Sequence, residues 1–433
     1  MIRAGLQRVN ITPPIGTPLG GYAARKSVSQ GIHDDLYATA LVLQGEEVTL
    51  ALVTADLVGL PQELVEKLRV AVRSSTGIPP DNVLVAATHT HSGPDLLFGD
   101  QGLASEAYVE VLADTLAGSV YAAWCSLQPA EVEVGQGWIE GIGVNRRTPA
   151  GTPVDPQVGV LRVDHEGRPR GVLVNYTCHP VVLGPDNLLI TADFPGYMVR
   201  VLEWVFGEGF TAMFTNGAAG DINTGHSAEL SALGEKIPGR TFERAEKLGT
   251  MLAGEVLKVL ETIEPCSNIP IAAMTKEISL PLKPLPSLKE AEASAKQKEQ
   301  ALTELIQRKA PSELVTKARI EKLYADLLLK QVHERSQRPH DGVKHVELQA
   351  IRIGDCALLA FPGELFVEIG LEIKAKSPFR YTYIVGYANG YVGYVPTKQA
   401  FEEGGYEAVT AQFAPETSDI VIEESLALLN SLA

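Results

Sequence analysis

The chain has 433 residues, of which 45% are hydrophobic and 21% are charged, so it can bury a sizeable core and has the composition of a soluble globular protein. Its 37 Lys and Arg residues against 53 Asp and Glu residues give a formal net charge of −16. An acidic chain repels phosphate backbones, so we expect no nucleic-acid partner.

Targeting segments and cysteines bear on where the protein works. The start, residues 1–5, lacks the apolar stretch of a secretory signal, and no apolar run approaches the ~20 residues that span a bilayer. The four cysteines lie far apart and form no C-x-x-C pair: Cys125, Cys178, Cys266 and Cys356. We interpret them as reduced core thiols and expect a cytoplasmic protein without stable membrane insertion. A zinc site built from cysteine is excluded.

A hairpin pattern recurs three times along the chain. Each copy has two apolar, partly β-branched strands joined by a short turn that contains glycine, and a polar residue follows the second strand. The strand pairs are 36–43 with 48–54, 158–163 with 171–177, and 347–353 with 356–361. The polar residues that follow them are Asp56, His179 and Glu364.

Two further apolar strands, 83–87 and 210–215, also run into polar sequence, the first at His89 and His91 and the second at Asp221. Helical patterns lie between the strands at 62–75, 105–124, 195–206 and 242–262. These elements predict the α/β class, with mixed β-sheets flanked by helices in a single domain that covers residues 1–433. Because ligands of such sheets bind beyond strand ends, the polar residues predict one common site.

Residues 287–336 differ in composition from the rest. Ser287 and Glu290 have the spacing of a capping box, and apolar residues then recur at helical spacing on both sides of a break at 310–312. We predict a charged helical hairpin inserted into the domain. It would serve packing or oligomer contacts, or cover the site as a lid.

Several residues after strands carry candidate chemistry, and each has a structural alternative. The His89 and His91 pair would point to one face if the strand continued, which suits one metal ion or a ligand beside a proton shuttle, but capping histidines remain open. His179 and Glu364 could be ligands, a structural histidine or a helix N-terminal acid. Four tyrosines crowd the stretch 386–406 and could pack together or bind near a cation: Tyr387, Tyr391, Tyr394 and Tyr406.

Other catalytic patterns are absent from the sequence. There is no Gly-x-x-x-x-Gly-Lys-Ser/Thr and no Gly-x-Ser-x-Gly, which disfavours a P-loop and a serine hydrolase of that design. The glycines around Asp221 and Asn223 allow a ligand to approach the backbone closely.

The order of these motifs resembles the neutral/alkaline non-lysosomal ceramidase family, in its catalytic N-terminal domain and as a divergent bacterial-type member. The matching elements span nearly the whole chain: Gly20-Gly21-Tyr22-Ala23, Ala87-Thr88-His89-Thr90-His91-Ser92-Gly93-Pro94, Asn145-Arg146, Cys178-His179-Pro180, Gly220-Asp221-Ile222, Pro362-Gly363-Glu364 and Asn389-Gly390-Tyr391-Val392-Gly393-Tyr394.

The resemblance implies a zinc-dependent hydrolase that cleaves a linear, N-acyl amide through metal-activated water. The implied Zn²⁺ ligands are His89, His179, Glu364 and Tyr394. The implied substrate-contacting and catalytic residues are His91, Arg146, Asn223 and Tyr406. The partner would be a small-molecule N-acyl or lipid-like substrate, and the oligomeric state is not defined by the sequence.

Three departures from the family pattern keep other functions open. The place of the family's serine is taken by Asn223, the C-terminal immunoglobulin-like domain is not present, and no export signal is found. They weaken ceramide as the substrate more than they weaken zinc hydrolysis. The alternatives are a zinc esterase or amidase acting on a small non-lipid substrate, and a catalytically silent, metal-containing binding protein.

Overall fold

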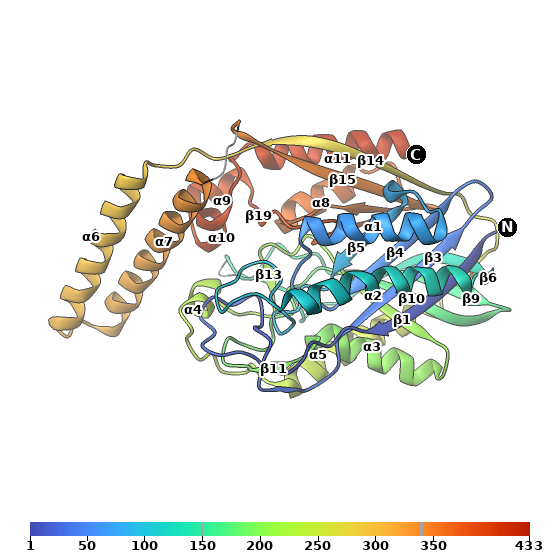
Figure 1. Cartoon of the computed structure of the whole chain (residues 1–433), viewed down its shortest axis with the longest axis horizontal. Coiled ribbons are helices and arrows are strands. Elements are labelled where there is room, and N and C mark those ends of the chain that lie inside the picture. Colours follow the sequence, from blue (N-terminus) through green and yellow to red (C-terminus); the bar gives the residue numbers. More distant parts are fainter. Residues whose placement is uncertain (149, 338–340) are drawn as a thin grey trace.

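The computed structural model describes residues 1–148, 150–337 and 341–433. Three sheets repeat one strand order (Figure 1). The first contains β1 (Arg3–Asn10), β3 (Tyr37–Gln44), β4 (Thr49–Ala55) and β5 (Val83–Ala87), with the short β6 (Gln128–Pro129) beside β1. The second contains β7 (Glu131–Trp138), β9 (Gln157–His165), β10 (Arg168–Tyr176) and β12 (Thr211–Asn216). The third contains β14 (Ile271–Pro281), β15 (Val343–Ile353), β16 (Cys356–Ala360) and β18 (Tyr381–Val385).

The pairing is the same in all three sheets. The first three strands are antiparallel neighbours, and the fourth pairs in parallel with the third. A helix joins the third strand to the fourth, namely α1 (Gln62–Thr76), α3 (Asp193–Phe206) and α8 (Val367–Lys376). A second helix follows the fourth strand, namely α2 (Glu106–Cys125), α5 (Phe242–Leu260) and α11 (Thr417–Leu432). The carboxyl ends of the third and fourth strands of each sheet therefore share one edge.

Each sheet is buried on both faces. In β4, Leu50 and Leu52 face a central core, whereas Ala51 and Val53 face the α1 and α2 side, as the two-residue period of a strand requires. The central core is formed by all three sheets, and its members include Leu52, Leu161 and Leu358. Outer clusters join each sheet to its own pair of helices.

Short elements line the edge where the strands end. They comprise β2 (Gly31–Ile32) with β11 (Leu189–Ile190), β8 (Val144–Asn145) with β13 (Ile222–Asn223), β17 (Glu364–Leu365) with β19 (Tyr394–Val395), and α4 (Ala228–Ala232), α9 (Lys398–Glu403) and α10 (Tyr406–Thr410). A 3₁₀ turn, η1 (Pro80–Asn82), precedes β5.

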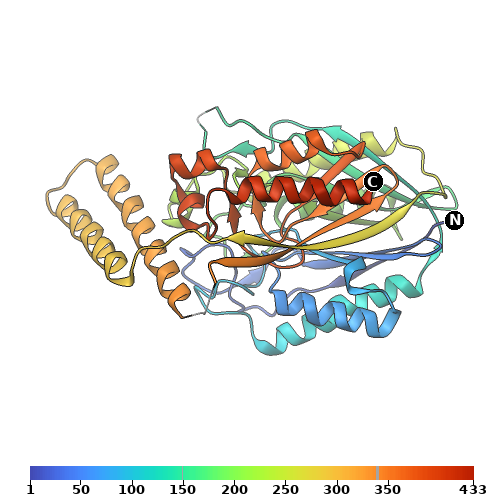
Figure 2. The same ribbon diagram turned by 90° about the horizontal axis from the view of Figure 1, so that it is seen from above.

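The helical hairpin consists of α6 (Leu288–Gln307) and α7 (Ser312–Ser336), inserted between β14 and β15. The predicted capping box is present, with Ser287 and Glu290 bonding each other's backbone. The hairpin projects from the body at the end opposite both termini (Figures 1 and 2). Its inner helix, α7, is tied to the body, because Tyr324 donates to Glu229 at 2.9 Å and Gln331 donates to the Thr410 carbonyl at 3.1 Å.

The predicted fold class is therefore confirmed, and the division into one domain with an insertion stays a prediction. Among the described residues, no helix is both long and apolar enough to cross a bilayer. The interpretation of the cysteines as core thiols is right for Cys178 and Cys356 but wrong for Cys125 and Cys266, which are exposed.

Replacing Leu358 by Ala should lower the free energy of unfolding by about 2–5 kcal/mol, because the side chain is 1% exposed in the core shared by the three sheets. Urea denaturation followed by circular dichroism measures the change. Leu314→Ala on α7, 49% exposed, is the matched control and should change stability by less than about 0.5 kcal/mol. Equal effects of the two variants would contradict the shared core.

Candidate functional site

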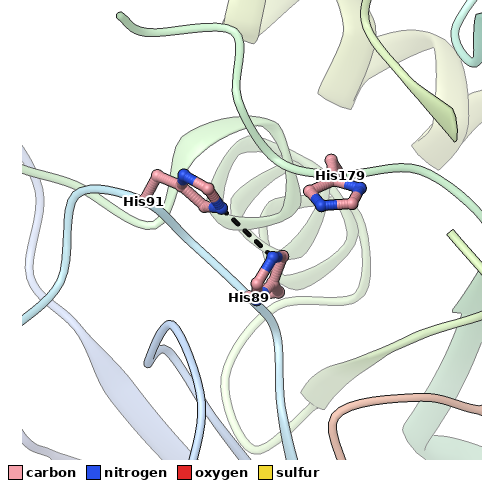
Figure 3. Close-up of side chains that lie close together, drawn as sticks. All are labelled: His89, His91 and His179. Carbon is pink, nitrogen blue, oxygen red and sulfur yellow. Dashed lines mark hydrogen bonds between the residues drawn. The ribbon is translucent and has the colours of Figure 1, made fainter. Parts of the chain in front are cut away.

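Three histidines from two of the sheets meet at the common edge (Figure 3). His89 and His91 follow β5, and His179 follows β10. One ring nitrogen from each lies within 4.8 Å of the others, an arrangement that can hold a metal ion. The Nε2 atoms of His89 and His91 are 3.1 Å apart, and the rings of His89 and His179 have centroids 4.7 Å apart.

The orientation of two of the rings is set by backbone carbonyls. Nδ1 of His89 contacts the Val58 carbonyl, and Nδ1 of His179 contacts the carbonyls of Ala219 at 2.6 Å and Ile222 at 3.0 Å. A carbonyl only accepts, so each Nδ1 carries the proton and each Nε2 keeps its lone pair. This is the tautomer that metal-binding histidines adopt when a second group holds the ring.

Glu364, the first residue of β17, completes the group. Its Oε2 lies 2.9 Å from Nε2 of His179 and 3.7 Å from Nε2 of His89. Nε2 of His179 is buried and has no hydrogen-bond partner. A carboxylate oxygen and an imidazole lone pair at this distance repel each other unless a cation lies between them. The residues present therefore fit a metal ion.

Two tyrosines hold the carboxylate of Glu364. Tyr391 donates its hydroxyl to Oε1 at 2.5 Å, and Tyr387 donates to Oε2 at 3.4 Å. The Tyr387 ring also stacks on His89, with centroids 3.9 Å apart. The sequence showed a crowd of tyrosines, but their spacing could not tell which ones reach the carboxylate.

The charge states favour ligand binding. Burial lowers the pKa of His89 to about 3, and burial together with the other two histidines lowers the pKa of His91 well below its usual value. Burial alone would raise the pKa of Glu364, but His89, His179 and the Tyr391 hydroxyl outweigh it and lower that pKa to about 2. At neutral pH the two imidazoles are uncharged and the carboxylate is ionised, which are the metal-binding forms.

His91 sits in a tight cradle. A Cβ on Gly21 would come within 2.4 Å of the His91 ring, and the φ of Gly21 is +90°, so this position requires glycine. The ring of Tyr22 meets His91 edge-on at 4.8 Å. Arg25, fully buried, donates to the carbonyls of His91, Leu19 and Gly20. Nδ1 of His91 is buried without a partner, so this ring is free to exchange a proton.

Arg146, Tyr394 and Tyr406 lie beside the metal-binding group. Tyr394 is the register partner of Glu364 in the β17–β19 pair and accepts a hydrogen bond from Nη2 of Arg146 at 3.3 Å. Arg146 also donates to Glu407 at 2.7 Å and to the Gly220 carbonyl at 2.8 Å. The ring of Tyr406 is 6.3 Å from that of Tyr394, and burial raises the pKa of Tyr406 to about 12.

Asn223 is occupied by its own turn. Its Oδ1 accepts from the backbone N–H groups of Gly225 at 2.8 Å and His226 at 3.1 Å, and its Nδ2 donates to the His226 carbonyl at 2.7 Å. The side chain therefore shapes the turn after β13, and a direct catalytic role for it stays a prediction.

Two expectations about the strand ends need correction. His89 does not continue the strand, because its φ is +71°, and His89 and His91 converge through this turn rather than by extended alternation. Asp56 does not join the histidines. Its carboxylate accepts from the Tyr37 backbone N–H at 2.9 Å and lines a cavity of about 250 Å³ whose wall contains none of the metal-site residues.

The fold and the site together define an α/β protein with a histidine and carboxylate centre of the kind found in metal-dependent hydrolases. A sequence model of the neutral/alkaline non-lysosomal ceramidase N-terminal domain matches residues 3–229. The chain belongs to this family.

Individual relatives agree with this assignment. Neutral ceramidase of Pseudomonas aeruginosa is 25% identical over 96% of this chain and 70% of its own length. Neutral ceramidases of Drosophila melanogaster and Mycobacterium tuberculosis are 28% and 26% identical, over 51% and 53% of this chain, and the matches span 36% and 41% of their lengths. The crystal structure of the Pseudomonas enzyme superposes with a TM-score of 0.76 at 21% identity, covering all of this chain and 74% of that one, which confirms the fold.

Replacing Tyr391 by Phe should weaken zinc binding about 10- to 100-fold, because Glu364 loses the hydroxyl that orients its carboxylate. Competition with a fluorescent zinc chelator measures the affinity. Tyr381→Phe, at the start of β18 and outside the site, serves as the control and should bind zinc like the wild type. Unaltered affinity in Tyr391→Phe would mean that this contact does not support a metal ligand.

Proposed function

We propose that the protein is a zinc-dependent hydrolase that cleaves the amide bond of linear N-acyl compounds. The observation that carries the proposal is the convergence of His89, His179 and Glu364, with both Nδ1 atoms held by carbonyls and both Nε2 atoms turned to one carboxylate oxygen. Family membership supports an amidohydrolase, since its named relatives are ceramidases.

The proposed zinc ligands are His89, His179, Glu364 and Tyr394, with His91 next to them. When bound there, zinc would lower the pKa of a water molecule to roughly 7 and supply hydroxide at neutral pH. A ligand set of two histidines and a carboxylate is common in zinc hydrolases.

The remaining residues bind the substrate carbonyl and handle the proton. Nε and Nη2 of Arg146 are used by Glu407, Gly220 and Tyr394, so in the described part of the chain Nη1 is left to donate to the carbonyl oxygen. The Tyr406 hydroxyl stays protonated and can donate to the same oxygen as charge develops. His91 would pass a proton to the leaving amine as the carbon–nitrogen bond breaks.

A serine is not needed for this chemistry, because the attacking oxygen comes from water. Asn223 replaces the residue that resemblance marks as a serine, and its side chain spends its polar atoms on the turn to His226. We propose that Asn223 positions this turn beside the substrate.

The double variant His89→Ala/His179→Ala should lose both the metal and the activity. Mass spectrometry of the wild type should find about one zinc per chain, and the variant should retain less than about a tenth of it, because two of the proposed ligands are gone. The control His333→Ala/His345→Ala removes two exposed histidines and should keep its zinc. Zinc that survives in the first variant would refute the ligand assignment.

Substrate chain length separates the lipid hydrolase from an esterase or amidase that acts on small compounds. With a series of N-acyl amides, kcat/KM of a lipid enzyme should rise about fourfold for each added methylene, following ~0.8 kcal/mol per buried CH₂. A flat series would favour a small, non-lipid substrate. Full zinc occupancy with no turnover of amides, esters or peptides would favour the silent binding protein.

A further inference from the structure

A second group of polar atoms lies buried and unsatisfied in the segment that follows β13. In the described part of the chain, the buried side-chain atoms without a hydrogen-bond partner include Oγ1 of Thr224, Nε2 of His226, and both Nε and Nη1 of Arg240. Thr224 is 0% and His226 is 3% exposed. Each such atom costs on the order of 1–3 kcal/mol unless something binds it, so their presence on one short segment indicates a ligand.

These atoms belong to one cluster. Arg244 donates to the Thr224 carbonyl at 2.6 Å. Burial and then the charges of Arg240 and Arg244 lower the pKa of His226 to about 3, which requires both guanidinium groups to lie near the imidazole. The hydrogen bonds of Asn223 hold the turn that presents His226.

The cluster adjoins the proposed metal centre through Tyr22. The guanidinium carbon of Arg240 is 5.8 Å from the centroid of the Tyr22 ring, and the same ring meets His91 edge-on at 4.8 Å. One aromatic ring therefore separates Arg240 from the histidine beside the scissile bond. A substrate bound at His91 needs to reach only past this ring to meet the guanidinium.

Arg240 is the arginine of this region with charge to spare. Arg146 and Arg147 both pair with Glu407, and Arg25 donates to backbone carbonyls. Arg240 makes one side-chain hydrogen bond, from Nη2 to Ser231 at 2.6 Å, and within the residues described no carboxylate lies at ion-pair distance from it. It also precedes α5, whose N-terminus begins at the Thr241 cap and adds positive potential.

We propose that Thr224, His226 and Arg240 form a subsite for an acidic group on the amine side of the substrate, so that the preferred substrates are N-acyl compounds whose amine portion carries a carboxylate or a phosphate. An acyl chain would lose free energy among these polar groups, whereas an anion satisfies all of their donors. The proposal rests on the proposed function and narrows its substrate class.

Matched substrate pairs test the subsite. N-hexadecanoylglycine is compared with N-hexadecanoylethanolamine, and ceramide phosphate with ceramide, on the zinc-loaded full-length protein. In the wild type, the acidic member of one pair should have at least a tenfold higher kcat/KM, and the pair that shows it distinguishes a carboxylate from a phosphate. Arg240→Gln should lower this acidic-to-neutral ratio about tenfold or more, and Arg240→Lys should restore part of it. Arg168→Gln, an exposed arginine on β10, should keep the wild-type ratio.

An acidic-to-neutral ratio that is the same in the wild type and in Arg240→Gln would overturn the subsite while leaving amide hydrolysis intact. If the wild type hydrolyses none of the four compounds, the proposed function fails, and binding decides about the subsite. Isothermal titration should then give a dissociation constant at least tenfold lower for one acidic compound than for its neutral counterpart, with the difference lost in Arg240→Gln. Equal dissociation constants would overturn the proposal.

Discussion

The packing of three sheets on one shared apolar core is the constraint on which the site depends. Leu52, Leu161 and Leu358 belong to different sheets and to the same cluster, so the sheets cannot shift relative to one another without opening the core. Because the third and fourth strands of each sheet run parallel, their carboxyl ends leave the core at the same edge. Residues that are hundreds of positions apart in sequence are brought together by packing alone, before any polar contact forms.

The polar contacts then remove the remaining freedom. His89 and His179 are positioned by carbonyls of neighbouring loops, and Glu364 is held by two tyrosine hydroxyls. Each charged or hydrogen-bonding atom of the site is thus supported by a second group, as preorganised metal sites require. The backbone strain at His89, with a φ of +71°, is tolerated because the buried ring is held on both sides.

Much of this arrangement follows from sequence patterns, and the rest does not for identifiable reasons. The hairpins, the four helices and the α6–α7 insertion were predicted to within a few residues, because continuous apolar strands and capping signals are local. The residues His89, His179 and Glu364 were recognised because each follows a strand end. The roles of Tyr387 and Tyr391 depend on distances across β17 and β19, and the open donors of Arg240 depend on which carboxylates lie nearby. Neither property is local in sequence. Asp56 has the same pattern as His179 but faces its own sheet.

The insertion of α6 and α7 has a consequence for how the chain could vary. It leaves and re-enters the third sheet beside one backbone hydrogen bond, from Leu282 N–H to the Gly342 carbonyl at 2.8 Å, next to the last pair of the β14–β15 ladder. In topological terms it is an enlarged hairpin loop, and closing a longer loop costs only about 0.6 kcal/mol for each doubling of its length. Related chains can therefore lengthen, shorten or exchange this segment without altering the register of the sheet. Since α7 rests on α4 and α10, such changes would remodel the approach to the site and spare its chemistry.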